Sequence, residues 1–349
     1  MEVVLADDFS GAAEVAGIAW RTGAPVELCR SFPDAFASGV TVIDTDTRLR
    51  ADEEAARVVG GICGAIREHG VERVYKKIDS VMRGPLAAEV EAALSGLGRD
   101  RAVVLSANPS RGRIIRDGRY FVEGIPLHET DFAGDPIHPT TTDRVREHVE
   151  DRSFIRTPDA ETLEEVRKIA ASLGPNELPV GAADFYRAWR GKENVRELDP
   201  SAAGRRLWIG GSQAIRAERE AAFAGHGIPV VEWGGEPIGE WADAVLSAAG
   251  PGGSVAMEIR RGFRIPAEEA LKALSEAGGR ILDEMGPDMV FAEGGATASA
   301  LMEERGWRRF RVTRELAPGV VGLRPADAPD APEWVVKPGS YPWPVAIYV

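Results

Sequence analysis

The feature that most constrains the fold is an alternation of short apolar segments with longer stretches of helical period. Apolar segments of strand length precede stretches with helical spacing in both halves of the chain. The expected strands are 3–6, 40–43, 73–78, 102–106, 207–209, 228–231, 254–258 and 289–292; the expected helices are 11–21, 51–68, 86–94, 161–173, 213–223, 241–249, 267–285 and 296–305. Strands that alternate with helices form mainly parallel sheets. The sequence therefore predicts an α/β fold.

The chain divides where this alternation breaks. The 349 residues suit two domains at roughly 100–200 residues each. Residues 191–206 are charged and include Pro200 and Gly204, so we predict two α/β domains, 1–205 and 206–349, with mainly parallel sheets. Residues 107–145 lack helical period, but their aromatic and apolar content favours an ordered excursion. We expect a further helix to begin within 180–189. Pro, Gly and Ala enrich the tail, residues 317–333, which closes with a strand at 334–337 and a final strand-like run at 344–348.

Charge and composition limit the classes of partner. The net charge of −13 disfavours a general nucleic-acid binder, because an acidic surface repels phosphate backbones. No apolar stretch approaches the ~18 residues of a membrane helix, and the first residues lack the basic, apolar pattern of a signal peptide. Cys29 and Cys63 lie among apolar residues, as buried reduced thiols do. We expect a cytoplasmic protein without nucleic-acid or membrane partners, and a homo-oligomer is compatible with the sequence.

Two adjacent carboxylates follow the first predicted strand. Asp7 and Asp8 stand directly before Ser10 and the first helix. One explanation is simple capping of that helix by Asp8 or Ser10. The other is a carboxylate that accepts the proton of a substrate hydroxyl or binds a sugar hydroxyl. The sequence leaves both open.

A cluster of cations follows a later strand. Lys76, Lys77 and Arg83 surround Asp79 between a strand and the Gly84–Pro85 pair. A solvated charge run is the ordinary explanation. The position at a strand end instead suits the binding of a small carboxylate-bearing substrate, for which Arg offers two parallel hydrogen bonds. Arg48 also follows a strand and is expected to join this cluster.

Glycine pairs mark two strand-to-helix junctions in the second half. Residues 210–212 read Gly-Gly-Ser, and 294–297 read Gly-Gly-Ala-Thr. Glycine lets the backbone approach a phosphate, and the first N–H groups of a helix point toward it. Neither junction fits the GxxxxGK[ST] or GxGxxG pattern. The histidines show no tight metal-ligand spacing; His128 and His138 are either ordinary loop residues or contacts to substrate.

These motifs together resemble the four-carbon acid sugar kinase family, whose members phosphorylate threonate, erythronate and related acids with ATP. The similar segments are 7–12, 76–84, 108–113, 124–130, 135–139, 211–212, 294–297 and 315–319. The resemblance implies an N-terminal acid-sugar domain, a C-terminal nucleotide domain and an active site in the cleft between them. It implies ATP, Mg²⁺ and a small-molecule sugar acid as ligands.

The resemblance also implies roles for particular residues. Those implied to hold the sugar acid are Asp7, Asp8, Arg48, Lys76, Lys77, Asp79, Ser80 and Arg83. Those implied to hold ATP are Ser212, Gly294, Gly295, Thr297 and Gly339. We expect Asp8 to accept the hydroxyl proton, with Asp79 as the second candidate.

Two positions depart from the family pattern. Ala296 stands where the family usually has Asp, and Pro338 lacks a backbone N–H that a phosphate could use. These changes favour the alternative of a sugar-acid-binding or regulatory protein that has lost phosphoryl transfer. A third hypothesis is a kinase of a related branched or oxo sugar acid.

Overall fold

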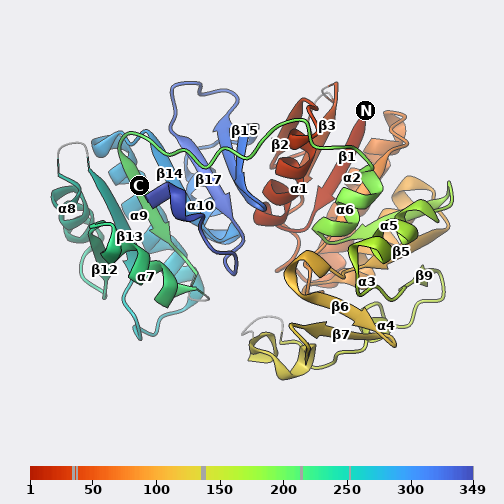
Figure 1. The fold of residues 1–349 in the computed structure, drawn as a ribbon. Helices are drawn as coiled ribbons and strands as arrows, with labels where there is room; N and C mark the ends of the chain where they lie inside the picture. Colours follow the sequence, from red (N-terminus) through yellow and green to blue (C-terminus); the bar gives the residue numbers. More distant parts are fainter. Residues whose placement is uncertain (34–35, 37, 135–138, 213–214, 251–252, 349) are drawn as a thin grey trace. The chain divides into compact units, whose positions relative to one another are not determined.

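The computed structural model describes residues 1–33, 36, 38–134, 139–212, 215–250 and 253–348 (Figure 1). Internal contacts divide the chain into two units. Unit 1 comprises Met1–Val15 and Arg30–Glu193, and unit 2 comprises Ala16–Cys29 and Asn194–Val349. Each contains a sheet whose strands alternate in sequence with helices. The predicted α/β class with mainly parallel strands is therefore confirmed.

Unit 1 is built on a parallel sheet with the order β3-β1-β4-β10-β5-β9. Its strands are β1 (Glu2–Ala6), β3 (Val40–Asp44), β4 (Val74–Lys77), β5 (Arg101–Leu105), β9 (Ile155–Arg156) and β10 (Glu177–Gly181). Strands β1 and β3 are buried at every position, as expected for a sheet covered on both faces. Ala6 is in register with Asp44 on one side and Lys77 on the other. The loops that carry the motifs therefore leave neighbouring strands at the same edge.

Helices connect these strands. They are α1 (Phe9–Arg21), α2 (Asp52–Glu68), α3 (Leu86–Leu97), α4 (Val145–His148), α5 (Leu163–Ala171) and α6 (Ala183–Arg190). Helix α1 belongs to unit 1 as far as Val15 and to unit 2 from Ala16 on. Thr162 and Glu165 form a reciprocal capping box at the start of α5. The expectation that a helix begins within 180–189 is confirmed. Residues up to Gly181 pair with β4 and β5, so helix α6 starts only at Ala183.

The excursion predicted over 107–145 is ordered where the structure describes it. It contains a small antiparallel sheet of β6 (Arg113–Arg116), β7 (Arg119–Val122) and β8 (Ile125–Pro126). Three short 3-10 turns flank these strands, at Pro109–Arg111, Leu127–Glu129 and Asp131–Gly134. Tyr120 on β7 is fully buried and anchors the small sheet to unit 1. His138 lies outside the described residues.

Unit 2 contains a mixed sheet with the order β12-β13-β11-β14-β17-β16-β15-β2. Strands β11 (Arg206–Gly210), β12 (Val230–Trp233), β13 (Ser254–Ile259), β14 (Met289–Glu293) and β17 (Glu333–Lys337) are parallel. Strands β2 (Val26–Cys29), β15 (Arg309–Ala317) and β16 (Val320–Pro325) are antiparallel. The sequence predicted no strand over 320–325, where β16 pairs with both β15 and β17. Gly319, with φ of 80°, makes the turn between β15 and β16.

Four helices complete unit 2 among its described residues: α7 (Arg216–Gly225), α8 (Ile238–Ala249), α9 (Ala267–Met285) and α10 (Gly295–Glu304). Residues 213–214, where the first of these was expected to begin, lie outside the described residues. The core of unit 2 is aromatic. Trp208 stacks on Phe291 with ring centroids 4.0 Å apart, and its ring is also parallel to that of Tyr348 at 5.2 Å.

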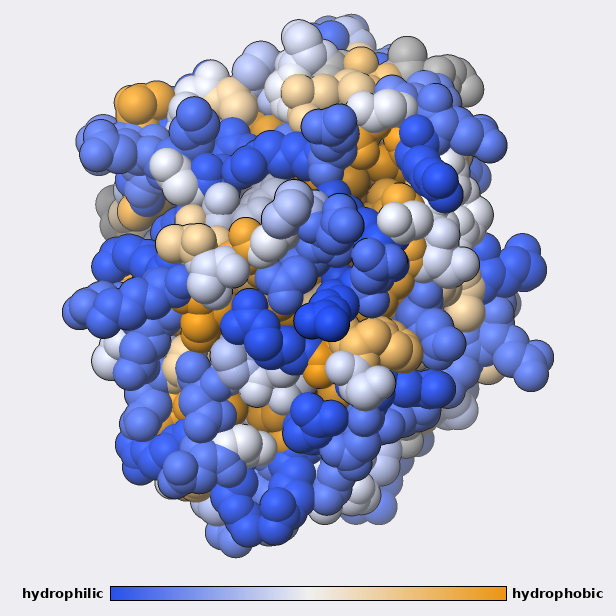
Figure 2. All heavy atoms as spheres, turned by 90° about the vertical axis from the view of Figure 1, so that its right-hand side faces the viewer, coloured by the Kyte–Doolittle hydropathy of each residue, from blue (hydrophilic) through white to orange (hydrophobic). Residues whose placement is uncertain are grey.

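None of the helices that the structure describes is long and apolar enough to cross a membrane. Figure 2 shows one face of the molecule, on which hydrophilic side chains predominate and apolar side chains form small groups among them.

Candidate functional site

The first junction of unit 1 holds Asp8 at the N-terminus of α1. Its Oδ1 accepts a hydrogen bond from the backbone N–H of Gly11 at 2.9 Å, and its Oδ2 accepts one from Ser10 Oγ at 2.5 Å. Asp8 therefore caps helix α1, which agrees with the first of the two explanations that the sequence left open. The cap does not bury the carboxylate, whose side chain keeps 18% of its exposure. Capping and a chemical role are compatible at this position.

Arg48 joins the two carboxylates of this junction. Its Nε and Nη2 donate to the two oxygens of Asp7 at 3.0 and 2.9 Å, a bidentate pair. Nη2 also donates to Asp8 Oδ1 at 2.7 Å. Burial alone would raise the pKa of Asp7, but the charges of Arg48 and Lys76 outweigh it and hold that pKa below its usual value. Asp7 is therefore ionised, and both of its carboxylate oxygens accept hydrogen bonds from Arg48.

The second junction adds Asp79 to this cluster. Its backbone N–H donates to Asp7 Oδ2 at 3.2 Å. Its carboxylate accepts from Arg83 Nε at 2.7 Å and from Arg83 Nη2 at 3.0 Å, and Arg48 Nη1 lies 3.9 Å away. Burial opposes ionisation, yet Arg83 and Arg48 hold the pKa of Asp79 well below its usual range. A carboxylate so strongly stabilised in its charged form is a poor proton acceptor.

The two lysines of this junction are buried and paired. Lys76 is fully buried, and its Nζ lies 2.8 Å from Glu89 Oε2. Lys77 Nζ donates to the carbonyl of Ile78 at 3.0 Å and lies 3.4 Å from Glu14 Oε2. A Cβ on Gly11 would stand only 3.1 Å from Lys77 Nζ and 2.7 Å from Asp8 Oδ1. Glycine at position 11 therefore lets Lys77 and Asp8 approach the start of α1 together.

Sequence reasoning missed Asp44, which ends β3 beside Ala6. Its Oδ1 accepts the N–H of Asp46 at 3.1 Å, while its buried Oδ2 has no hydrogen-bond partner among the described residues. Burial, together with the nearby charges of Asp46 and Asp8, raises the pKa of Asp44 to about 8. Asp44 is therefore protonated at neutral pH. The signal in the sequence was an acidic residue at the end of a buried strand.

Asp44 predicts a pH dependence of stability. Its folded pKa exceeds the ordinary Asp value, so the folded state binds the proton more tightly between about pH 4 and 8. The stability that proton binding to Asp44 contributes is complete below about pH 4 and is lost as the pH rises toward 8. The loss is on the order of 2–4 kcal/mol. Asp44→Asn should flatten this part of the profile of unfolding free energy measured by denaturant titration from pH 5 to 8. Parallel profiles for variant and wild type would contradict the assignment.

The small antiparallel sheet contributes two further residues that sequence reasoning missed. Arg113 Nη1 donates to Ser80 Oγ, and the hydroxyl of Tyr120 donates to the carbonyl of Ser80. The predicted site residue Ser80 is thus bound to β6 and β7. His128 lies apart from this contact, with Nδ1 3.8 Å from Asp143 and Nε2 3.6 Å from Glu129.

The glycine junctions of unit 2 also converge. A Cβ on Gly211 would overlap Thr297 Oγ1, and a Cβ on Gly339 would stand 2.7 Å from Ser212 Oγ. Gly294 has φ of 92° and donates its N–H to the carbonyl of Lys337 at 3.1 Å. Three loops that follow β11, β14 and β17 therefore lie in contact. Gly211 and Gly339 are required by the close approach of another loop, and Gly294 by its positive φ.

No acidic side chain in the first turn of α10 balances the positive end of the helix dipole. Gly295 is its first residue, Ala296 is exposed and Thr297 is buried, and the first turn carries no acidic side chain. The positive end of the helix dipole and its free N–H groups are therefore not neutralised by the helix itself. Such an end favours an anion.

A row of buried charges lies beside these glycines. Gly210 is in register with Glu258 and Glu293, and Glu293 with Lys337, so the row runs across the carboxyl ends of four strands. Lys337 Nζ lies 3.0 Å from Glu293 Oε2, and burial lowers the pKa of Lys337 to about 8 despite the opposing charge of Glu293.

Arg219 on α7 completes this row. Its Nε donates to Glu258 Oε1 at 2.7 Å, and its Nη1 donates to both Glu293 and the carbonyl of Ser212. The sequence motifs gave no indication of Arg219 or Glu258, because neither stands next to a glycine pair. The hydrogen bond from Arg219 to the carbonyl of Ser212 fixes the backbone of that loop.

Both units are α/β folds, and each carries charged or glycine-rich loops at the carboxyl edge of its own sheet, the place where open α/β sheets bind ligands. The sugar-binding N-terminal domain family matches residues 2–186, more than half of the chain. The chain belongs to the four-carbon acid sugar kinase family, and the resemblance carried by the sequence motifs is confirmed.

Curated relatives carry names of kinases acting on four-carbon acids. A D-threonate kinase of Salmonella typhimurium is 36% identical over 169 residues, 48% of this chain but only 40% of that protein. A D-threonate kinase of Bordetella bronchiseptica is 28% identical, over 86% of this chain and 84% of that protein. A 3-oxo-tetronate kinase of Pectobacterium atrosepticum is 22% identical, over 93% of each chain. The first of these matches spans less than half of the relative's length.

Solved structures share the fold. A protein of Salmonella typhimurium described as a putative tRNA synthase superposes with a TM-score of 0.78 at 18% identity, covering 99% of this chain and 97% of that one. A Bordetella bronchiseptica protein described as a domain-swapped dimer with bound citrate is 25% identical with a TM-score of 0.51, covering 97% and 94%. At 18% identity, the first likeness shows the fold alone.

Proposed function

We propose that this protein is an ATP-dependent kinase that phosphorylates the terminal hydroxyl of a four-carbon sugar acid such as threonate or erythronate. The observation that carries the proposal is the connected cluster of Asp7, Asp8, Asp79 and Arg48 at the carboxyl edge of the unit 1 sheet. Carboxylates bind sugar hydroxyls and accept their protons, while guanidinium groups balance the charge of an acid. The names of the relatives support the same chemistry.

In this proposal Asp8 is the general base. It is the most exposed of the three carboxylates of the cluster, with 18% against 3% for Asp7 and 9% for Asp79. Asp8 takes the proton from the substrate hydroxyl as that oxygen attacks the γ-phosphorus of ATP, and the bond to the β-phosphate oxygen breaks to release ADP. Asp7 and Asp79 hold Arg48 and Arg83 in place.

The sugar acid is proposed to contact Lys77, Ser80 and Arg83 as well as Asp8. Lys76 is proposed to act on the site through its charge and not by touching the substrate, because its ammonium is fully buried against Glu89. Positioning and charge stabilisation supply most of the rate in such a transfer.

Ser212, Gly294, Gly295, Thr297 and Gly339 are proposed to hold the phosphates of ATP in unit 2. Their support is the mutual approach of three loops and the uncompensated N-terminus of α10. No group of three acidic, His or Cys side chains among the described residues is arranged to hold a metal ion. In this proposal Mg²⁺ would arrive with the nucleotide.

Two observations favour alternatives. Ala296 leaves the first turn of α10 without a carboxylate, and Pro338 offers no N–H, which suits a sugar-acid-binding or regulatory protein without phosphoryl transfer. The name of the Pectobacterium relative favours an oxo acid as substrate instead. A homo-oligomer is part of the proposal, since the Bordetella structure is described as a dimer.

A screen of D-threonate, D-erythronate and 3-oxo-tetronate with ATP and Mg²⁺, following ADP release, tests the proposal. We expect turnover with at least one acid and saturable nucleotide binding by calorimetry. Binding of an acid without nucleotide binding would establish the non-catalytic alternative.

A further inference from the structure

The cations assigned to the substrate carboxylate are already paired within unit 1. Arg48 is bound to Asp7 and Asp8, with contacts of 2.9 and 2.7 Å. Lys77 lies 3.4 Å from Glu14. These pairs balance the acidic residues of the cluster, so these two cations offer little uncompensated charge to an incoming carboxylate.

Arg83 is engaged in the same way. Its guanidinium makes a bidentate pair with Asp79, at 2.7 and 3.0 Å. A substrate carboxylate that took this guanidinium would have to displace Asp79 or share it. The sugar acid therefore needs another cation at this edge of the sheet.

Arg113, the first residue of β6, is that cation. Its Nη1 donates to Ser80 Oγ, and the described part of the chain offers it no carboxylate within ion-pair distance. Its side chain is half-buried, and its charge still reaches Asp79, whose pKa it helps to lower. An Arg has five N–H donors, so most of those on Arg113 remain for a ligand.

Aromatic packing holds Arg113 beside the cluster. The Cζ atoms of Arg83 and Arg113 each lie 5.6 Å from the centroid of the Phe132 ring. Tyr120 is fully buried and donates its hydroxyl to the carbonyl of Ser80. The hairpin of β6 and β7 is thus anchored to the loop that carries Asp79 and Ser80, and the Arg113 guanidinium is held in place before any ligand binds.

We propose that Arg113 binds the carboxylate of the sugar acid and thereby selects acids over neutral polyols of the same length. The inference rests on the proposed function and deepens it. A planar guanidinium held at one edge by Ser80 Oγ can present its remaining donors to a carboxylate in two parallel hydrogen bonds. Arg48 and Arg83 then orient the acidic residues that meet the hydroxyl groups.

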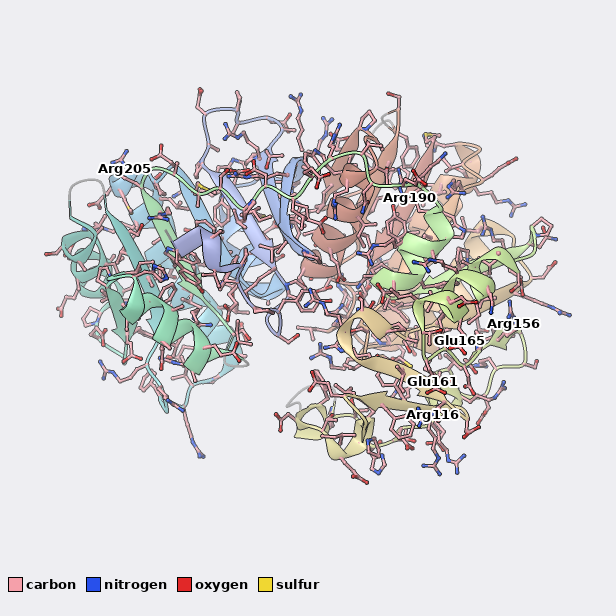
Figure 3. The ribbon with its side chains drawn as sticks, in the orientation of Figure 1. Arg116, Arg156, Glu161, Glu165, Arg190 and Arg205 are labelled. Atoms are coloured by element: carbon pink, nitrogen blue, oxygen red, sulfur yellow. The ribbon has the colours of Figure 1, made fainter. Side chains whose placement is uncertain are left out.

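The test compares Arg113→Met with Arg116→Met. Both residues belong to β6, but Arg116 is 56% exposed and pairs with Glu161 (Figure 3). Calorimetry without nucleotide measures the binding of D-threonate, D-erythronate and the polyol threitol. Arg113→Met should weaken the binding of the acid by about 10- to 100-fold and that of threitol by less than about threefold. Arg116→Met should change neither.

Arg113→Lys provides a second variant that keeps the charge but loses the planar fork. It should fall between wild type and Arg113→Met for the acid. Equal loss of acid and polyol in Arg113→Met, no loss of acid, or a wild type that binds no sugar acid would each overturn the proposal. The calorimetry contains no nucleotide, so its outcome is separate from that of the ADP-release screen. A wild type that binds D-threonate but releases ADP with none of the acids when ATP and Mg²⁺ are added would refute the kinase and leave the role of Arg113 intact.

Discussion

Asp8→Asn is expected to lower kcat for the sugar acid by about 10²- to 10⁴-fold, while the affinity for ATP changes by less than about twofold. The amide cannot accept the hydroxyl proton. Its oxygen can still accept the N–H of Gly11, so the cap of α1 is retained. The effect is measured as kcat from ADP release and as Kd for ATP from calorimetry.

Two controls separate base catalysis from structural damage. Ser10→Ala removes the hydroxyl that donates to Asp8 Oδ2 and should cost far less than Asp8→Asn. Asp79→Asn should raise KM for the acid because Arg83 loses its bidentate partner. Equal loss of turnover and ATP affinity in Asp8→Asn would remove Asp8 as the base, and a larger loss of kcat in Asp79→Asn would transfer the role to Asp79.

The features that the sequence predicted well are local in the chain. Strand β1 is a continuous apolar run, so it was recognisable as a buried parallel strand. The strand-to-helix junctions at Asp8 and at Gly294 followed from the same alternation, because each polar or glycine residue stands directly after such a run. Within each unit, the junctions gather at the carboxyl edge of that unit's own sheet because the strands that precede them are parallel.

The features that were missed depend on pairing between distant positions. Arg219 meets Glu293 across 74 positions of sequence and Glu258 across 39, and neither spacing leaves a local pattern. Strand β16 was missed for another reason. Residues 317–333 are rich in Pro and Gly, and that composition outweighed the short apolar run of Val320 and Val321, which pairs with β15.

Glu293→Gln is expected to lower the free energy of unfolding of unit 2 by about 3–5 kcal/mol, or its Tm by on the order of 10 °C. Glu293 is 1% exposed and lies against two cations, Arg219 and Lys337, which are themselves 2% and 0% exposed. The amide keeps an acceptor for Trp343 Nε1 but withdraws the negative charge. Lys337 then has no carboxylate partner among the described residues, while Arg219 keeps Glu258, which it shares with the buried Arg216. Removing one member of such a network costs far more than the network contributes.

A double variant and an exposed control make this prediction specific. Glu293→Gln combined with Lys337→Met removes one buried charge of each sign, so the double variant should recover most of the lost stability. In Lys337→Met alone, Glu293 keeps its ion pair with Arg219. Glu161→Gln, which breaks the exposed pair with Arg116 in unit 1, should change Tm little (Figure 3). In Glu293→Gln the Lys337 ammonium also loses the negative charge that opposes its deprotonation, so the pKa of Lys337 should fall below about 8. The stability lost by Glu293→Gln, relative to wild type, should therefore shrink as the pH rises toward 8. A Tm loss that is the same at every pH, or no recovery in the double variant, would show that packing rather than charge holds this edge of the sheet together.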